Sequence, residues 1–577
     1  MTSLDWIVLL GTMIGIAAYG TWRTRHTDNL NTYLKGSRTT KWGTIGISVM
    51  ATQASTITYL SLPGQAYENG IAFIQNYFGL PLALILVSAV FLPIYRKLGV
   101  YTAYEYLGKR FDQKTRLLGA SLFLLQRGIQ AGITIYAPAI ILATVLGWRL
   151  DLTIIFTGLL AIVYTVTGGS AAVNLTQKWQ MGVIFGGMLT AFVILLYKLP
   201  PHATAAAGAL GKLHAVDYSL DPQVRYTFWS GILGGFFLSL SYFGTDQSQV
   251  QRYLGGARLR EGRLGLMFNA VLKIPMQFFI VMLGALLFVF YQYHPQTPVI
   301  FNQTQWERQL EGPQAATFQD IEQRHAEAHA AKRERLIAWS AARESGDAAG
   351  EATAREAMLE AQQRWESIRQ EARSTLQAAD PAARKTRDSD YVFITFIVTQ
   401  LPKGIVGLLI AVMFASALSS KAGELNALGT TSTIDLWRHF RPLAEQDEPR
   451  NVRNAKWFTA VWGLFAICFA LFVSFAENLI EALNIVASIF YPALLGVFLV
   501  AFFFKHVRGS AAFWGTIAAQ ALTISLYLYG RLNPEHEIGY LWLNPIGCAG
   551  CVIFCLLLQA AFGKQDGSGG ASAAAAH

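Results

Sequence analysis

Long apolar runs dominate the pattern of hydrophobic and polar positions along this chain. About thirteen of these runs are long enough to cross a bilayer, because roughly 20 helical residues rising about 1.5 Å each span the hydrocarbon core. The pattern therefore predicts an all-α, polytopic membrane protein whose first run is a retained helix, since further spans follow it. The predicted spans are residues 4–22, 43–64, 71–95, 117–146, 150–167, 176–197, 227–245, 264–293, 389–420, 456–475, 478–504, 510–529 and 540–562.

A long polar segment interrupts this pattern between the eighth and ninth spans. Residues 303–388 are rich in Ala, Glu, Arg and Gln, and this composition predicts two helices at about 316–344 and 350–378. We expect an extracytoplasmic helical hairpin, which serves either as a solvated structural element or as a lid or docking surface. The chain then divides into two membrane regions, this hairpin and a tail that resembles a linker or tag, at residues 1–302, 389–565, 303–388 and 566–577.

Composition and charge fit a membrane protein. Of the 577 residues, 53% are hydrophobic and only 14% are charged, so the chain is too apolar for one soluble core. The net charge of +10 gathers in loops that would all lie on one side if every run spans. Because Lys and Arg are enriched in cytoplasmic loops, we expect the N-terminus outside and the C-terminus inside a bacterial inner or plasma membrane. The excess charge then requires no nucleic-acid partner.

The sequence does not indicate an enzyme. No nucleophile–base pair, phosphate-binding loop or cluster of metal ligands stands out. The four cysteines lie in apolar segments, which favours packing over a redox or metal role. No obligatory protein partner is evident either, so the expected partners are the lipid bilayer and a small-molecule solute.

The most polar stretch within an apolar run is at residues 401–437. It begins as an apolar helix and then gathers hydroxyl, amide and charged side chains. Unpaired polar groups that face lipid cost several kcal/mol each, so we expect this helix to line an aqueous or ionic space. Ser416, Ser419 and Ser420 share one helix face at the spacing i, i+3 and i+4. Such serines either supply oxygen ligands to a sodium ion or let helices pack closely.

Two other spans contain signals for interrupted helix. The second span includes Thr52, Gln53 and Ser55, and the seventh includes the pair Gly234 and Gly235 followed by serines. We expect both spans to unwind in mid-membrane and expose backbone carbonyls. Interrupted helices at matching places in two repeats mark the binding site of many transporters.

Several motifs resemble those of a known family. In chain order they are ATQASTITYLSLPGQAYENG, YRKLGVYTAYEYLGKRF, ITIYAPA, TGGSAAV, YFGTDQSQVQRYL, FASALSS and NALGTTSTIDLW. Together they resemble the sodium/solute symporter family, which includes sodium/glucose, sodium/iodide, sodium/monocarboxylate and sialic acid cotransporters. The resemblance covers about residues 5–530 without the insertion. It implies sodium as the coupling ion, alternating access, and a five-plus-five inverted repeat formed by spans two to six and seven to eleven.

Carried over by position, the resemblance implies a sodium site between the second and ninth spans. Its ligands would be the carbonyl oxygens of Ala51, Ala54 and Ser416 and the hydroxyls of Ser419 and Ser420. All five positions hold compatible residues.

A second sodium site, present in some family members, has no counterpart here. The acidic and hydroxyl ligands of that site are missing, since Thr176 is followed by Gln177 and Lys178, and Ser420 is followed by Lys421, Ala422 and Gly423. We therefore predict one sodium ion per transport cycle, because no anionic oxygen remains to offset the desolvation of a second cation. Either lysine could pair with Glu424 and supply a fixed charge, or both could extend to the cytoplasmic interface.

The resemblance also implies a set of residues in contact with the solute. The signals on its identity conflict: sugar-carrying relatives have a glutamate at Tyr77, yet Lys273 matches their sugar-contacting lysine, and Gln130 replaces an arginine of sialic acid carriers. Lys273 would contact the solute or form a structural pair, and Tyr242 would act as an inner gate or pack as an ordinary aromatic. The full set is Gln53, Ser55, Thr58, Tyr77, Gln130, Ser239, Tyr242, Lys273 and Asn484.

These observations predict a sodium-coupled symporter that imports a small polar solute, with a sugar or sugar derivative favoured. The alternatives are a symporter for organic anions, monocarboxylates or amino acids, a transporter-like solute sensor, and a uniporter or proton-coupled carrier.

Overall fold

The structure is a computed structural model in which helices form most of the described chain. It describes all residues except 25–40, 101, 201–202, 256–257, 381–382, 384–386, 441–447, 474–477 and 563–577, and the side chains of residues 16–24, 167–178 and 448–449 are also left aside. The predicted tail at 566–577 and the side chain of Lys178 therefore lie outside the described residues.

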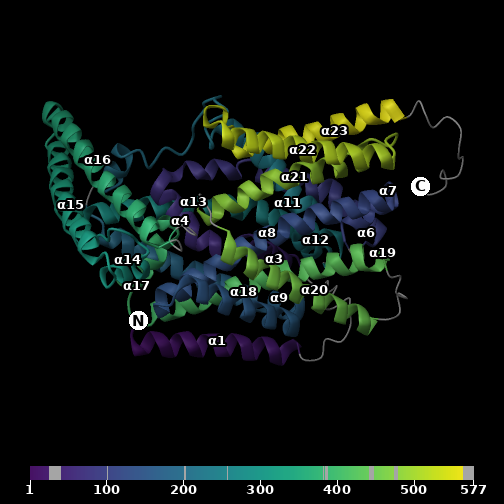
Figure 1. Cartoon of the computed structure of the whole chain (residues 1–577), viewed down its shortest axis with the longest axis horizontal. Helices are drawn as coiled ribbons and strands as arrows, with labels where there is room; N and C mark the ends of the chain where they lie inside the picture. Colours follow the sequence, from purple (N-terminus) through teal and green to yellow (C-terminus); the bar gives the residue numbers. More distant parts are fainter. Residues whose placement is uncertain are drawn as a thin grey trace, which may run out of the picture.

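The described residues form α-helices with short 3₁₀ and π segments, and they contain no strand. Most of the long helices run along the long axis of the molecule (Figure 1). The α-helices are α1 (Ser3–Thr24), α3 (Trp42–Gln53), α4 (Thr56–Asn69), α5 (Leu80–Leu86), α6 (Leu92–Leu98), α7 (Tyr104–Arg110), α8 (Gln113–Leu146), α9 (Leu150–Lys198), α10 (Ala203–Ala209), α11 (Gly235–Thr245), α12 (Gln247–Leu254), α13 (Leu259–Tyr293), α14 (Gln303–Leu310), α15 (Ala315–Glu344), α16 (Ala348–Ala379), α17 (Val392–Gln400), α18 (Ile405–Thr431), α19 (Arg438–Phe440), α20 (Glu448–Phe472), α21 (Leu479–Phe503), α22 (Gly509–Leu532) and α23 (Leu543–Phe562). The shorter segments used below are η1 (Gly70–Tyr77), η2 (Val87–Phe91), η3 (Ser230–Gly234) and η5 (Asp388–Tyr391).

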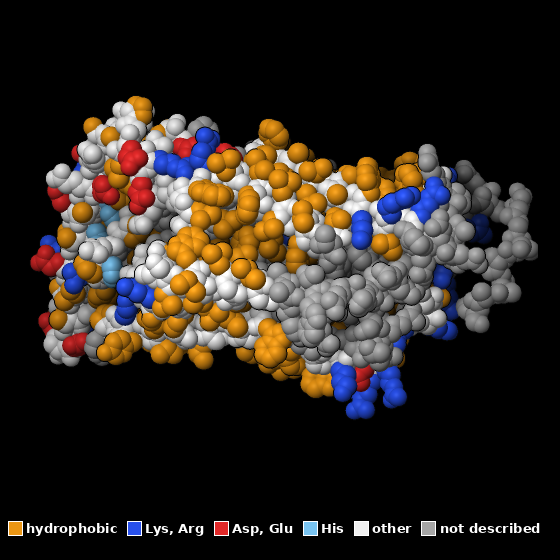
Figure 2. Space-filling model, turned by 90° about the horizontal axis from the view of Figure 1, so that it is seen from below, with side chains coloured by type: hydrophobic (Ala, Val, Ile, Leu, Met, Phe, Trp, Pro, Cys, Tyr) orange, Lys and Arg blue, Asp and Glu red, His pale blue; other side chains and the backbone are white. Residues whose placement is uncertain are grey.

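Apolar side chains cover the middle of one face of the molecule (Figure 2). Figure 2 shows hydrophobic side chains over the central part of the visible face, with charged side chains gathered toward the two ends. Large apolar side chains are exposed on the outer helices, for example Leu10 on α1, Leu159 on α9 and Leu557 on α23. Within the described ranges, nine helices are long and apolar enough to cross a membrane. Contact with lipid explains these exposed side chains, because lipid tails do not penalise apolar surface.

The helices do not follow all the predicted spans. The third predicted span, 71–95, is divided among η1, α5, η2 and α6, and the spans predicted at 150–167 and 176–197 fall within one helix, α9. The number of spans, the inverted repeat and the orientation in the membrane stay predictions.

The predicted ninth span, 389–420, is wrong at its beginning. A short helix, α17, ends at Gln400, and the long helix α18 begins only at Ile405. Pro402 lies in the connection, and Gly404 has a φ of 88°, which favours glycine. α18 then continues to Thr431, so the whole polar part of this stretch belongs to one buried helix.

The second predicted span is interrupted as expected. Helix α3 ends at Gln53, and Ala54 has φ −87° and ψ 64°, outside helical geometry. Ser55 is extended with ψ 175°, and α4 begins at the next residue. Because the last carbonyls of a helix lack intrahelical partners, this break presents backbone oxygens to neighbouring elements.

The seventh predicted span does not unwind at its glycine pair. Segment η3 continues directly into α11, and the helical run ends only at Asp246, whose ψ is 118°. A Cβ atom at Gly234 would lie 2.5 Å from the carbonyl oxygen of Leu541, and one at Gly235 would lie 2.6 Å from that of Asn76. The glycines therefore permit close packing against neighbouring backbone, and they do not mark a break.

The insertion forms a helical hairpin at one end of the molecule, where the first residues of α1 also lie (Figure 1). Helices α15 and α16 begin and end within two residues of their predicted bounds, and Gly346 in the turn has a φ of 71°. The hairpin has its own apolar core, which includes Phe318, Ile321 and Trp365.

Candidate functional site

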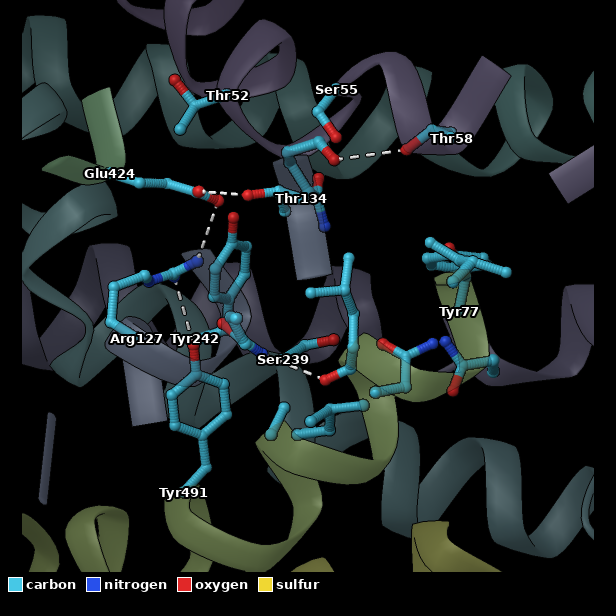
Figure 3. A pocket seen from close by; sticks show the side chains of 18 of the residues that line it. Thr52, Ser55, Thr58, Tyr77, Arg127, Thr134, Ser239, Tyr242, Glu424 and Tyr491 are labelled. Carbon is cyan, nitrogen blue, oxygen red and sulfur yellow. Dashed lines mark hydrogen bonds and ion pairs between the residues drawn. The ribbon is translucent and has the colours of Figure 1, made fainter. Parts of the chain in front are cut away.

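All nine residues predicted to contact the solute line one cavity of about 110 Å³ (Figure 3). They come from the α3–α4 break, η1, α8, α11, α13 and α21, so residues far apart in sequence converge there. The cavity lining also includes Arg127, Thr134 and Glu424, which the sequence did not assign to the solute site. The lining thus combines polar and charged side chains with apolar ones such as Leu238 and Ile480.

The predicted sodium ligands lie where α18 packs against the α3–α4 break. Ser416, Ser419 and Ser420 are buried on α18, and Ala51 and Ala54 are buried beside the break. Each residue is therefore shielded from solvent in this part of the structure.

Two side-chain hydrogen bonds join α18 to the broken helix. The hydroxyl of Ser420 donates to the carbonyl oxygen of Thr52 at 3.4 Å. From the other side of the break, the hydroxyl of Thr56 donates to the carbonyl oxygen of Met413 at 2.7 Å. The break and the serine face of α18 are thus direct neighbours.

The oxygen atoms at this junction fit an alkali cation. The hydroxyl of Ser419 is buried and has no hydrogen-bond partner among the described residues. A buried polar atom without a partner is costly, so this hydroxyl is suited to bind something that the protein alone does not supply. Unwound carbonyls together with hydroxyls are the ligands that transporters offer to sodium. The individual ligands stay a prediction.

Lys421 pairs with Glu424, as one of the two alternatives predicted. The ammonium nitrogen of Lys421 lies 3.5 Å from a carboxylate oxygen of Glu424, and the lysine side chain is only 3% exposed. It also donates hydrogen bonds to the carbonyl oxygen of Ala131 and the hydroxyl of Thr134. The alternative that Lys421 extends to the membrane interface is therefore wrong.

A buried ion-pair network beside the cavity was not predicted. Arg127 lies between Glu424 and Tyr491 in Figure 3, and its guanidinium is 3.4 Å from a carboxylate oxygen of Glu424. On its other side the guanidinium pairs with Asp246, which is fully buried. The Tyr491 hydroxyl donates to the same Asp246 carboxylate at 2.6 Å. An arginine within the apolar run of α8 was the available signal, because ionisable residues at membrane depth usually serve function or pair with each other.

Tyr242 covers this network on the cavity side. The guanidinium carbon of Arg127 lies 5.6 Å from the centre of the Tyr242 ring, and the Tyr242 hydroxyl accepts a hydrogen bond from Gln249 at 2.6 Å. The ring is thus held in place by a cation–π contact and a hydrogen bond. Its predicted role as an inner gate stays a prediction.

Lys273 differs from the other charged residues of the cavity. Its side chain is fully buried, and its ammonium group has no hydrogen-bond partner among the described residues. The nearest notable contact is the ring of Tyr77, whose centre lies 5.8 Å from the ammonium nitrogen. The structural pair that was the alternative for Lys273 is therefore not found in the described part of the chain.

The model of the Sodium:solute symporter family matches residues 33–301 and 373–519, which is most of the chain. The chain belongs to this family. The unmatched residues between these ranges include most of the hairpin.

Relatives of this symporter carry different solutes. The mouse sodium-coupled monocarboxylate transporter 2 is 23% identical over 98% of this chain and 84% of that protein. The sodium/sialic acid symporter SiaT of Proteus mirabilis (strain HI4320) is 23% identical over 95% of this chain and 93% of that protein. The human sodium/iodide cotransporter is 32% identical, but this match spans only 43% of the chain and 39% of the cotransporter.

A solved structure shares the fold of this symporter. The substrate-bound outward-open state of a Na+-coupled sialic acid symporter aligns with a TM-score of 0.70 at 22% identity, and the alignment covers 97% of this chain and 98% of that one. The family, its coupling to sodium and a multi-pass membrane protein are thereby confirmed.

Proposed function

We propose that this symporter uses a sodium gradient to import a small organic anion that also carries hydroxyl groups, such as a sugar acid. The observation that carries this proposal is the ammonium group of Lys273, which is buried at the cavity without a hydrogen-bond partner among the described residues. An uncompensated charge in a low-dielectric site is costly, so a ligand that supplies the opposite charge binds favourably there.

The balance of charges around the cavity supports an anion. Arg127 and Lys421 share two carboxylates, those of Asp246 and Glu424. These four charges compensate one another, and Lys273 adds one further positive charge. A neutral sugar would leave this charge unpaired, whereas the carboxylate of a sugar acid would form a charge-assisted hydrogen bond with it.

Amide side chains around the cavity support a solute with hydroxyl groups. The Asn484 nitrogen and the side-chain oxygens of Gln53 and Asn76 are buried and have no hydrogen-bond partner among the described residues. They offer one donor group and two acceptors, which two hydroxyl groups of a solute can satisfy because each hydroxyl both donates and accepts. A plain monocarboxylate only accepts hydrogen bonds, so it would leave the amide oxygens of Gln53 and Asn76 without a donor.

The α3–α4 break supports coupling between the solute and sodium. Gln53 and Ser55 line the solute cavity, and Ala54 between them is a predicted sodium ligand. Both ligands would therefore contact the same short segment, so each would favour the backbone arrangement that the other requires. Alternating access follows if this arrangement belongs to only one of two states.

The experiment is uptake into proteoliposomes with an imposed inward sodium gradient. Glucuronate and glucose form a matched pair, because they differ in the carboxylate, and propionate tests a carboxylate without a hydroxyl group. We expect sodium-stimulated uptake of glucuronate well above that of both other compounds. Glucose uptake equal to that of glucuronate would refute the anion, and uptake insensitive to sodium would favour a uniporter or proton-coupled carrier.

A further inference from the structure

The ammonium group of Lys421 lies in a cage of oxygen atoms. It donates to the carbonyl oxygen of Ala131 and the hydroxyl of Thr134, both on α8, and lies 3.5 Å from the carboxylate of Glu424. The hydroxyl of Thr134 in turn donates, at 2.7 Å, to the same Glu424 oxygen that lies near the ammonium group. A carbonyl, a hydroxyl and a carboxylate thus surround one positive charge in a water-poor interior.

This cage uses the kinds of oxygen that bind an alkali cation. Hard cations prefer carbonyl, hydroxyl and carboxylate oxygens, and an ammonium group is a compact charge that uses the same acceptors. Glu424 and Thr134 also line the solute cavity, and Lys421 directly follows the serines of the predicted sodium site. The cage is therefore adjacent to both ligands of the carrier.

The charges around the cage require a cation in it. Without Lys421, the buried carboxylates of Asp246 and Glu424 would share only the guanidinium of Arg127. The network would then hold one uncompensated negative charge, which a low-dielectric interior strongly disfavours. A small cation from solution would restore the balance if the space were open.

We infer that Lys421 is a tethered cation whose ammonium group occupies a second alkali-cation site formed by Ala131, Thr134 and Glu424. The lysine thereby fixes the number of sodium ions that this carrier binds at one. Shortening the side chain leaves the oxygen cage in place and opens it to sodium. This inference rests on the proposed function, since it takes the serine site of α18 as the place of the first sodium ion.

The test counts the sodium ions bound to the purified full-length chain with radioactive sodium, without solute and at constant ionic strength held by choline chloride. We expect one ion for the wild type and two for Lys421→Ala, with the Hill coefficient of binding rising from about 1 toward about 2. Lys421→Met is the matched control. Methionine has a similar length but no charge and fills the space, so this variant should bind one ion.

A second variant distinguishes sodium binding in the oxygen cage from nonspecific binding to a loosened protein. Lys421→Ala combined with Glu424→Gln lacks the carboxylate, so we expect the count to return to one. One bound ion in a folded, monodisperse Lys421→Ala protein would overturn the inference. Two ions in the wild type would overturn it as well, and this measurement needs no variant. Lys421→Thr repeats the test if the alanine variant does not fold.

Failure of the proposed function would give a different result. A wild-type protein that binds one sodium ion but shows no sodium-driven uptake of glucuronate would refute the anionic solute. The ion counts of the wild type and of Lys421→Ala would still decide the role of the lysine.

Discussion

Replacing Lys273 by glutamine should weaken the binding of an acidic solute and at the same time stabilise the empty carrier. The ammonium group is fully buried and has no hydrogen-bond partner among the described residues, so the empty protein bears the cost of desolvating it. Glutamine removes this cost and keeps a polar group of similar length. The same change removes the charge that would pair with the solute carboxylate.

The size of the effect on binding follows from the burial of Lys273. Two unit charges about 3 Å apart attract each other by about 5 kcal/mol at an effective dielectric constant of about 20. Desolvation of the solute carboxylate offsets part of this attraction, and loss of one partner from a buried charge pair costs about 2–5 kcal/mol. At about 1.4 kcal/mol per factor of ten, glucuronate should bind Lys273→Gln roughly 30-fold to a few thousandfold more weakly.

The assay is isothermal titration of wild type, Lys273→Gln and Lys273→Arg with glucuronate and glucose in saturating sodium, together with melting of the protein without solute. Lys273→Arg keeps the charge and should retain most of the preference for glucuronate over glucose. Lys273→Gln should lose that preference and melt at a higher temperature than the wild type. An equal loss of affinity for both compounds would refute the reasoning, because it would mark Lys273 as a structural residue.

Three further predictions concern other parts of the molecule. Ser419→Ala removes a buried hydroxyl without a partner and should weaken sodium binding about tenfold, as measured by radioactive sodium; unchanged binding would exclude this ligand. Asp246→Asn breaks the buried pair with Arg127 and should lower the free energy of unfolding by about 3–5 kcal/mol; an unchanged melting temperature would contradict this. Burial lowers the pKa of His325 to about 3 and that of His329 to about 4 in the hairpin, from an ordinary value of about 6.5. As the pH falls, the two histidines therefore bind protons in the unfolded hairpin before they do so in the folded one. The stability of the folded hairpin should fall as the pH drops from about 6.5 toward 4. Hydrogen exchange of residues 315–379 at pH about 6.5 and about 4, corrected for the intrinsic effect of pH, measures the stability of the hairpin. Equal protection at the two pH values would refute the predicted loss of stability.

The sequence predicted which residues meet at one cavity better than it predicted the helix boundaries. Gln53, Ser55 and Thr58 are closely spaced polar positions in an apolar span, a pattern with few stable solutions other than a polar cavity. The long apolar helices and the charged hairpin could also be predicted from the sequence, since length and composition determine them. Helix ends depend instead on contacts with neighbouring elements. The connection at Pro402 interrupts the predicted span 389–420, although the sequence stays hydrophobic on both sides of it.

The ion pairs and the glycine pair show where local patterns are insufficient. Asp246 and Arg127 are 119 residues apart, and their charges come together because α11 and α8 both pack against α21. Gly234 and Gly235 have the composition of a helix break, yet they serve close packing against Leu541 and Asn76. A glycine gives the same local signal in both cases, so its role depends on contacts that a single sequence does not contain.

The four residues from Thr52 to Ser55 explain how solute and sodium can act on each other without direct contact. Thr52 accepts a hydrogen bond from Ser420 on the serine face of α18, while Gln53 and Ser55 line the solute cavity. A displacement of this short segment, in which the helix is broken at Ala54 and Ser55, would therefore change both sites at once, whereas a continuous helix would separate them by its own rigidity. Binding free energies are reciprocal, so the factor by which sodium raises the affinity for the solute must equal the factor by which the solute raises the affinity for sodium. If the segment is the physical link, stiffening it into helix should reduce both factors together and leave the intrinsic affinities of the two sites less affected.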